Sequence, residues 1–394
     1  MSEKKKLVPK RRFKEFENAD PWEQQKVESL FKITRGYVLA ADKTSLRKTK
    51  TMKYPVYSSQ TLNNGLLGYY NEFLFEKAIT WTTDGANAGT VCYRNEKFYS
   101  TNVNGVLISK VGYSCKAVAE SLNRVAWKHV TKVGNPKLMN NTMSNIILMV
   151  PIDFEELDKI SKFFTYTDNL ITLHQRKLEK LKNLKSAYLS EMFPAEGERK
   201  PKRRFAGFTD DWEQRKIGEI CDVYDGTHQT PKYKDSGIMF LSVENIDTLS
   251  SEKYISQDDF KKDFSIYPEK DDVLMTRIGD IGTANVVDRT QPIAYYVSLA
   301  LLKTKILDSY FLKESIASKS VKKDLWKRTL HIAFPKKINK NEITQVVVSY
   351  PIDKKEQEII GEYFLGIDNL ITLHQRKLEK LQNIKKAYLN EMFI

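Results

Sequence analysis

The side chains best suited to chemistry in this sequence gather in short polar loops. One loop lies between Gly226 and Pro231 and is rich in Thr, His and Gln. Side chains of these types, with Lys and Arg, make the hydrogen bonds by which proteins read base edges and hold phosphates. We therefore predict DNA contacts in the second half at Thr227, His228, Gln229, Thr230, Lys232 and Arg277. The alternative is that these are solvated loop residues.

The first half offers a second set, in which a basic run is followed by a polar loop and a Gly-rich turn. The predicted DNA contacts here are Arg47, Lys48, Lys50, Lys53, Ser58, Ser59, Gln60, Thr83 and Asn87. Each of them has the same alternative as a solvated turn residue. Trp22 and Trp212 are predicted to anchor hydrophobic cores rather than to stack on bases. The basic runs at 4–6 and 199–204 are predicted to be solvated linker charge.

Composition favours a polyanionic partner. The 394 residues include 64 Lys and Arg against 50 Asp and Glu, which gives a net charge of +14. Such a surplus favours nucleic acid, although charge that only aids solubility is the alternative. Cys92, Cys115 and Cys221 lie far apart without a CxxC pair, so we expect neither a zinc site nor a disulfide framework. The charged first residues do not resemble a signal peptide, and no apolar run is long enough for a membrane span, so we expect a cytoplasmic location.

No motif for catalysis stands out. The sequence lacks a G-x-x-x-x-G-K-[ST] phosphate loop and the Asn/Asp-Pro-Pro-aromatic motif of amino-methyltransferases. Residues 279–283 resemble a phosphate loop weakly, but a hairpin turn explains them better. We therefore predict a chain without catalytic residues, metal or cofactor of its own.

The segments that flank these loops occur twice in the sequence. Residues 168–180 and 368–380 are identical, and extending the match to Phe193 and Phe393 leaves four differences in 26 positions. The starts repeat as well, because 9–13 recurs as 201–205 and Trp22-Glu-Gln recurs at Trp212. The predicted organisation is a globular domain at 1–150, its helix at 151–193, a linker at 194–200, a second globular domain at 201–350 and its helix at 351–394.

Each unit is predicted to end in a long helix. Asp153 and Asp353 are good N-caps, and a Glu three residues after each completes a capping-box pattern. Apolar residues then recur at three- and four-residue steps, which predicts a coiled-coil-like stripe. The obvious partner for one helix is the other, in an antiparallel pair. His174 and His374 fall on the stripe and are predicted to fix its register.

The globular regions show short strand-like runs between turns. Examples are 78–82, 103–108, 238–243 and 272–277. The predicted fold class is therefore α+β, with two mixed α/β domains separated by a pair of long antiparallel coiled-coil helices in a pseudo-two-fold internal repeat. Nearly identical helices beside diverged domains indicate that the two helices have the same role, whereas the two domains have related but different roles.

This arrangement resembles the specificity subunit of type I restriction-modification enzymes over nearly the whole chain. The resemblance is carried by the Phe-x-x-Phe and Trp-Glu markers of both unit starts, by the repeated Gln-Arg-Lys-Leu helix, and by the segments 54–59, 78–85, 225–231 and 272–279. Any one motif is weak, but together, in order and duplicated, they are specific.

The resemblance implies a non-catalytic DNA-binding subunit. Each globular domain would be a target-recognition domain that reads one half of a bipartite site in double-stranded DNA. The helices would set the spacer and dock two methyltransferase subunits, which restriction subunits then join. Adenine-N6 methylation and DNA cleavage would belong to those partners, with S-adenosylmethionine, ATP and Mg as their cofactors.

Two other interpretations remain open. A stand-alone DNA-binding regulator or structural protein shares the charge and the helices, but leaves the matched helix faces without a purpose. A nuclease in its own right would need a metal-carboxylate set that the sequence does not display.

Overall fold

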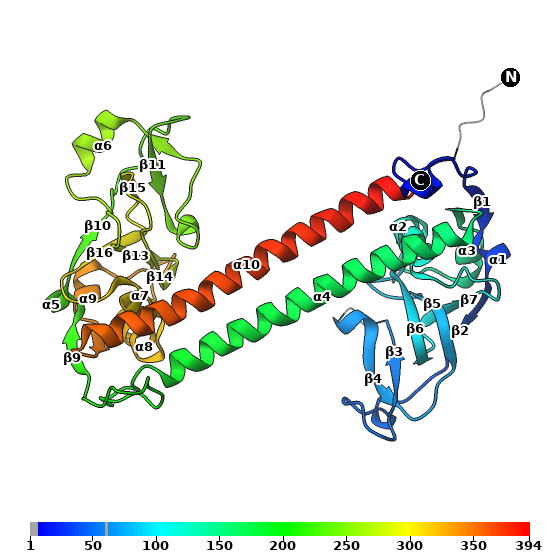
Figure 1. Ribbon diagram of the computed structural model, residues 1–394, viewed down its shortest axis with the longest axis horizontal. Helices are drawn as coiled ribbons and strands as arrows, with labels where there is room; N and C mark the ends of the chain where they lie inside the picture. Colours follow the sequence, from blue (N-terminus) through cyan, green and yellow to red (C-terminus); the bar gives the residue numbers. More distant parts are fainter. Residues whose placement is uncertain (1–6, 60–61) are drawn as a thin grey trace. The chain divides into compact units, whose positions relative to one another are not determined.

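The computed structural model describes residues 7–59 and 62–394, which form two compact units. Unit 1 consists of Met1–Gln175 and Arg376–Ile394, and unit 2 consists of Arg176–Gln375. Both boundaries fall inside long helices, because α4 covers Phe154–Glu191 and α10 covers Lys354–Met392. Each unit is therefore a globular domain with a part of both long helices (Figure 1).

Unit 1 is built around one mainly antiparallel sheet. The strands of unit 1 are β1 Glu23–Lys26, β2 Lys32–Arg35, β3 Tyr54–Tyr57, β4 Leu66–Tyr70, β5 Phe75–Thr82, β6 Val91–Ser100, β7 Asn104–Ile108 and β8 Ile147–Val150. The sheet order is β2-β7-β5-β6-β3-β4, with β3 and β6 parallel, and β1 pairs separately with β8. The strands predicted at 78–82 and 103–108 are confirmed as β5 and β7.

Unit 2 divides its strands among separate sheets. They are β9 Glu213–Lys216, β10 Cys221–Asp225, β11 Ile238–Leu241, β12 Tyr254–Ile255, β13 Val273–Ile278, β14 Asp280–Val286, β15 Ile293–Tyr295, β16 Leu299–Thr304 and β17 Val347–Tyr350. The sheet orders are β10-β16-β13-β14, β12-β11-β15 and β17-β9. The strands predicted at 238–243 and 272–277 are confirmed as β11 and β13. The turn predicted at 279–283 joins β13 to β14 as a hairpin.

Shorter helices complete each domain. Unit 1 contains α1 Val27–Leu30, α2 Lys116–Ala126 and α3 Asn140–Ser144, and unit 2 contains α5 Ile217–Ile220, α6 Gln257–Asp263, α7 Ser309–Ala317, α8 Lys319–Lys327 and α9 Lys340–Thr344. The prediction that both tryptophans anchor cores is confirmed, since Trp22 and Trp212 are buried. In unit 1 the ring centroids of Trp22 and Phe393 are 6.1 Å apart, and in unit 2 those of Trp212 and Phe193 are 5.9 Å apart. Each core thus includes the end of a long helix that began in the other unit.

Both long helices begin at the predicted caps. Asp153 Oδ1 accepts a hydrogen bond from Glu155 N at 2.7 Å, and Asp353 Oδ1 accepts one from Lys355 N at 2.9 Å. These bonds satisfy backbone donors that an uncapped first turn leaves without partners. The predicted N-caps are confirmed.

The predicted capping boxes are wrong, because the glutamates at the third position bind arginines instead. Glu156 accepts from Arg12 Nε at 2.8 Å and from Nη2 at 2.5 Å, and Glu356 accepts from Arg204 Nε at 2.6 Å and from Nη2 at 2.7 Å. Both glutamates are buried, and a buried carboxylate needs a paired, hydrogen-bonded cation. The repeated start motif therefore fastens the N-terminal segment of each unit to a helix start.

The preceding arginine of the same motif fastens a helix end. Arg11 Nε lies 2.5 Å from Glu391 Oε2 in unit 1, and Arg203 Nε lies 2.7 Å from Glu191 Oε2 in unit 2. The prediction of solvated linker charge at 199–204 is thus wrong for Arg204, whose side chain is 13% exposed, whereas that of Arg203 is 57% exposed despite its ion pair. The run 4–6 lies outside the described residues.

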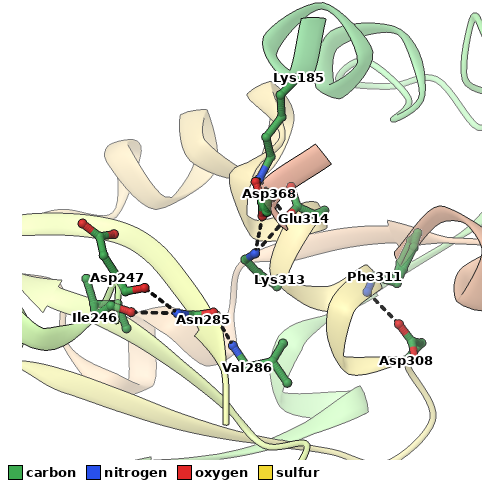
Figure 2. Close-up of polar contacts among 10 residues, drawn as sticks. All are labelled: Lys185, Ile246, Asp247, Asn285, Val286, Asp308, Phe311, Lys313, Glu314 and Asp368. Carbon is green, nitrogen blue, oxygen red and sulfur yellow. Dashed lines mark hydrogen bonds and ion pairs between the residues drawn. The ribbon is translucent and has the colours of Figure 1, made fainter. Parts of the chain in front are cut away.

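An ion cluster joins the long helices to the domain of unit 2 (Figure 2). Lys185 Nζ on α4 lies 2.7 Å from Asp368 Oδ1 on α10 and 3.0 Å from Glu314 Oε1 on α7. Lys313 Nζ lies 2.5 Å from Asp368 Oδ2 and 3.3 Å from Glu314 Oε1. Burial alone would raise the pKa of Asp368, but Lys313 and Lys185 outweigh it and hold the pKa below its ordinary value.

The same cluster recurs in unit 1 with the roles of the long helices exchanged. Asp168 is now on α4 and lies 2.6 Å from Lys116 and 2.7 Å from Lys385 of α10. Both lysines also contact Glu120, at 2.7 and 3.0 Å. Burial again opposes the two lysines, which lower the pKa of Asp168. Position 168 meets 385 and position 368 meets 185, so the helix segments within each unit are antiparallel, as predicted.

Candidate nucleic-acid interface

The polar loop predicted in unit 2 leaves the sheet at the end of β10. Gly226 begins it, and a Cβ at this residue would lie 2.4 Å from Tyr295 O, so only glycine permits the close passage. Thr227 N donates to Tyr295 O at 3.1 Å, and Thr227 O accepts from Val297 N at 3.0 Å. Beyond this fixed root lie the exposed candidates His228, Gln229, Thr230 and Lys232. The structure brings this predicted set together on one exposed loop, and their contact with bases stays a prediction.

Arg277 lies beneath this loop rather than on its surface. The residue is 5% exposed, its Nε donates to Ile338 O at 3.1 Å, and its Nη1 pairs with the Asp225 carboxylate. The guanidinium therefore joins the end of β10 to the segment that precedes α9. A base contact by Arg277 stays a prediction, but the observed hydrogen bonds make this side chain a positioning residue for the two loops that it joins.

One of these loops is a narrow hairpin at residues 329–337, which we call the unit 2 hairpin. Leu330 N donates to Lys337 O at 2.8 Å, and Gly279 N of the β13–β14 turn donates to Lys336 O at 2.8 Å. The tip carries exposed apolar side chains at Ile332 and Phe334. The sequence prediction missed this hairpin, although the apolar run at 332–335 is an unusual signal in a basic segment.

Unit 1 has the same frame with different side chains. Thr83 occupies the position of Arg277, because Leu138 N donates to Thr83 O at 2.8 Å as Ile338 N donates to Arg277 O at 3.0 Å. Thr83 is fully buried, and its hydroxyl donates to Val103 O at 2.9 Å. The two buried candidates of the sequence prediction are therefore equivalent residues, and both are occupied by internal hydrogen bonds.

The two loops of this frame also exist in unit 1. Gly36 matches Gly226, since a Cβ there would lie 1.9 Å from Ser100 O. Tyr37 and Val38 follow it and are exposed, and the sequence prediction missed both. Residues 131–137 form the matching hairpin, which we call the unit 1 hairpin, with Thr131 N donating to Lys137 O at 2.9 Å.

Four of the remaining candidates of unit 1 line two hollows near β3 and β6. A hollow of about 540 Å³ is lined by Lys48, Lys53, Tyr54, Pro55, Tyr57, Leu66, Tyr69, Glu96 and Lys97. A polar pocket of about 100 Å³ is lined by Ser58, Asn64, Gly65, Thr80, Thr82, Asn87, Thr90, Cys92, Arg94 and Asn104. The structure thus places Lys48 and Lys53 at one hollow, and brings Ser58 together with Asn87, 29 residues further along the chain, at the other.

Arginine stacking links the two hollows. The Arg94 guanidinium lies 3.6 Å from the ring centroid of Tyr57, and its Nη2 donates to Asn64 O at 2.7 Å. Tyr57 OH donates to Glu96 Oε1 at 2.5 Å, and burial together with this bond raises the pKa of Tyr57. Tyr57 is therefore a neutral hydrogen-bonding side chain at neutral pH.

Among the described residues, three other candidates of unit 1 do not line these two hollows. Arg47 and Lys50 are exposed, and Ser59 is partly exposed. Gln60 lies outside the described residues.

The titratable groups give little support for catalysis. Burial raises the pKa of the Cys115 thiol and raises that of Cys221 to about 12, which disfavours either as a nucleophile. Within 7–59 and 62–394, His, Cys, Asp and Glu side chains form no group that could hold a metal ion. Across the same ranges, no helix is both long and apolar enough to cross a membrane.

Comparison with known proteins identifies the class. Residues 19–183 and 209–383 match the family described as the type I restriction modification DNA specificity domain. The chain contains two copies of this domain, which together span most of its length. The chain therefore belongs to the specificity subunits of type I restriction-modification systems.

Individual relatives agree with this assignment. The specificity subunit of the type I restriction enzyme MjaVIII from Methanocaldococcus jannaschii is 22% identical over 86% of this chain and 84% of its own length. A type I specificity subunit N-terminus from Mycoplasma pneumoniae is 39% identical over 31% of this chain, and the match spans 66% of that relative. The longer match shows that the resemblance extends over both units.

Solved structures show the same fold. The crystal structure of a type I restriction-modification S subunit from M. genitalium superposes with a TM-score of 0.73, covers 98% of this chain and 99% of its own, and is 14% identical. A chain from a study of complex assembly and conformational transition of the type I system superposes with a TM-score of 0.50 at 13% identity. At these identities the likeness concerns the fold.

Proposed function

We propose that each unit reads one half of a bipartite site in double-stranded DNA, so that the chain supplies the sequence specificity of a type I restriction-modification complex. The observation that carries this proposal is the equivalence of Thr83 and Arg277. The two units share one backbone frame at these positions, yet the loops that project from it differ in length, charge and apolar content. A duplicated frame with different loops suits the recognition of two different half-sites.

Electrostatics supports DNA as the ligand. The net charge of +14 supplies the sequence-independent attraction to phosphates that accompanies DNA binding. The loops of unit 2 and the hollows of unit 1 contain the Gln, Asn, Ser, Thr and Lys side chains used for base and phosphate contacts. The chain itself supplies recognition in this proposal, not catalysis.

The repeated helices are proposed to dock two methyltransferase subunits. The helices share the identical run 168–180 and 368–380, in which Leu173 of unit 1 and Leu373 of unit 2 form an equivalent exposed pair. Two equal surfaces suit two copies of one partner. Restriction subunits would join these, and the partners would use S-adenosylmethionine, ATP and Mg for adenine-N6 methylation and cleavage. We place this complex in the cytoplasm, where bacterial and archaeal chromosomal DNA lies.

The function is tested by sequencing methylated adenines in the host genome with and without the gene for this chain. We expect one bipartite motif to lose methylation when the gene is removed and to regain it on complementation. A methylation pattern that does not depend on the gene would contradict the proposal and favour a stand-alone DNA-binding regulator.

We also propose that the long helices set the unread spacer. Inserting four residues after Lys177 and after Lys377 keeps the pair matched, adds ~6 Å to each helix and rotates the stripe by only ~40°. Because a base-pair step is ~3.4 Å, we expect the same half-sites separated by about one or two more base pairs in the methylated motif. A two-residue insertion rotates the stripe by roughly 200° and should abolish assembly. An active four-residue variant with the original spacer would show that the spacing is set elsewhere.

A further inference from the structure

We propose that the unit 2 hairpin contacts DNA through its apolar tip, with Ile332 and Phe334 packed against base surfaces in a groove of the half-site read by unit 2. This inference rests on the proposed function and adds to it a contact surface that differs in chemistry from the polar loop at 227–232. The tip would supply apolar contact, and the lysines at its base would supply phosphate contact.

The exposure of the tip is the first observation. Ile332 is 99% exposed and Phe334 is 104% exposed, so neither side chain packs against the domain. Neither belongs to the hydrophobic core clusters of unit 2. Leaving two large apolar side chains in water has a free-energy cost without a benefit to the fold, and side chains of this kind mark interaction sites when they lie together.

The hairpin is held firmly despite its exposed tip. His331 and the ring of Trp326 lie 4.4 Å apart between centroids, and Lys336 Nζ lies 4.5 Å from the centroid of the same ring. At its base, Lys336 O accepts from Gly279 N and Ile338 O accepts from Arg277 Nε. The tip is therefore presented on a fixed support, which reduces the entropy lost on binding.

Arg277 places this hairpin beside the predicted base-reading loop. The same guanidinium that binds Ile338 O pairs with Asp225, the residue directly before Gly226. The polar loop and the hairpin thus share one root in the structure. Two loops that leave the domain from a shared root are suited to contact the same half-site.

Charge around the hairpin favours DNA as the occupant. Lys336 and Lys337 are exposed, and among the described residues no carboxylate lies within ion-pair distance of either. The nearby acids Asp324 and Glu342 are paired with Arg328, at 2.9 and 3.2 Å. An apolar tip on a cationic base matches the surface of duplex DNA, where apolar wedges from proteins enter a groove between phosphate rows.

The unit 1 hairpin supports this interpretation by contrast. It has the same backbone pairing, and its tip carries the single apolar residue Val133, which is 89% exposed. Lys132 and Lys137 flank it. Both hairpins therefore present an exposed apolar residue between lysines, while the larger tip belongs to unit 2 alone.

The test measures DNA binding by the full-length chain. Duplexes are first selected from a random pool by the wild-type chain, and their affinity is then measured for I332S/F334S, for K336Q/K337Q and for the control I306S, whose Ile306 is an exposed apolar residue elsewhere in unit 2. We expect I332S/F334S to bind about tenfold more weakly or worse with an unchanged salt dependence, because apolar contacts release no counterions. We expect K336Q/K337Q to reduce the slope of log affinity against log salt by about one or two.

The outcomes separate the inference from the function on which it rests. A wild-type chain that selects no sequence would overturn the proposed function. A wild-type chain that selects a motif, with I332S/F334S binding that motif as tightly as I306S, would overturn the hairpin inference alone. Loss of methyltransferase co-purification by I332S/F334S, with DNA affinity intact, would show that the tip docks a protein instead. Thermal unfolding of each variant, expected to be unchanged, excludes a folding defect.

Discussion

Units 1 and 2 differ in how much of their structure they share. The anchors of the long helices are the same in both, from Arg12–Glu156 and Arg204–Glu356 to the clusters around Asp168 and Asp368. The projecting loops differ, with two hollows in unit 1 and a large apolar hairpin tip in unit 2. The two units therefore share the contacts that hold the long helices and differ in the loops that project from each domain.

The largest expected effects come from the buried anchors. Glu156→Ala and Glu356→Ala each remove a buried carboxylate and leave unpaired an arginine side chain that is only 3% or 13% exposed, so each should lower the free energy of unfolding by ~3–5 kcal/mol. Chemical denaturation measures this loss. Glu391→Ala and Glu191→Ala are matched controls that remove the exposed pair of the same motif, and they should change stability little because solvent screens such pairs. Similar effects from buried and exposed glutamates would contradict the shared-anchor account.

The next effect should be confined to unit 2. Arg277→Ala removes the bonds to Ile338 O and Asp225, so we expect ~1–3 kcal/mol lower stability and weaker recognition of the unit 2 half-site at several positions. Thr83→Ala at the equivalent residue should leave the unit 2 half-site unchanged. Thermal unfolding and binding to single-base variants measure these outcomes. An Arg277→Ala chain with unaltered stability and relaxed reading of one base would instead show a direct base contact.

A smaller, symmetric effect is expected in acid. The lowered pKa values of Asp168 and Asp368 mean that their contribution to stability is complete above the ordinary aspartate pKa of about 3.9 and is lost as the pH falls through the lower folded values. Unfolding curves from pH 6 downward measure this loss. Asp168→Asn and Asp368→Asn should each be less stable at neutral pH and less sensitive to acid. Variants as acid-sensitive as the wild type would contradict the role of these clusters.

The sequence predicted the features that depend on local pattern. The repeat, the long helices, the caps at Asp153 and Asp353, and the buried Trp22 and Trp212 follow from spacing, capping chemistry and residue type. Antiparallel pairing within each unit also followed, because identical helices joined through a whole domain have each other as the nearest apolar partner.

The features that the sequence did not predict depend on tertiary pairing. An Arg in a strand beside a Gly-rich turn has the composition of a base-reading residue, yet Arg277 is buried because the carbonyl of Ile338 and the carboxylate of Asp225 meet it there. Arg204 looked like linker charge because its partner Glu356 is 152 residues away. The exposure of Phe334 could not be predicted from residue type, because most phenylalanines of this chain are buried in a core.

The central claim, that the two units read independently, is tested most directly by exchanging one of them. Residues 20–150 are replaced with the recognition domain of another specificity subunit, and the methylated motif is determined by sequencing methylated adenines in cells that supply the partner subunits. We predict that one half-site changes while the other half-site and the spacer stay the same, and that replacing 210–350 changes the opposite half. A simultaneous change of both half-sites in either exchange would contradict the account.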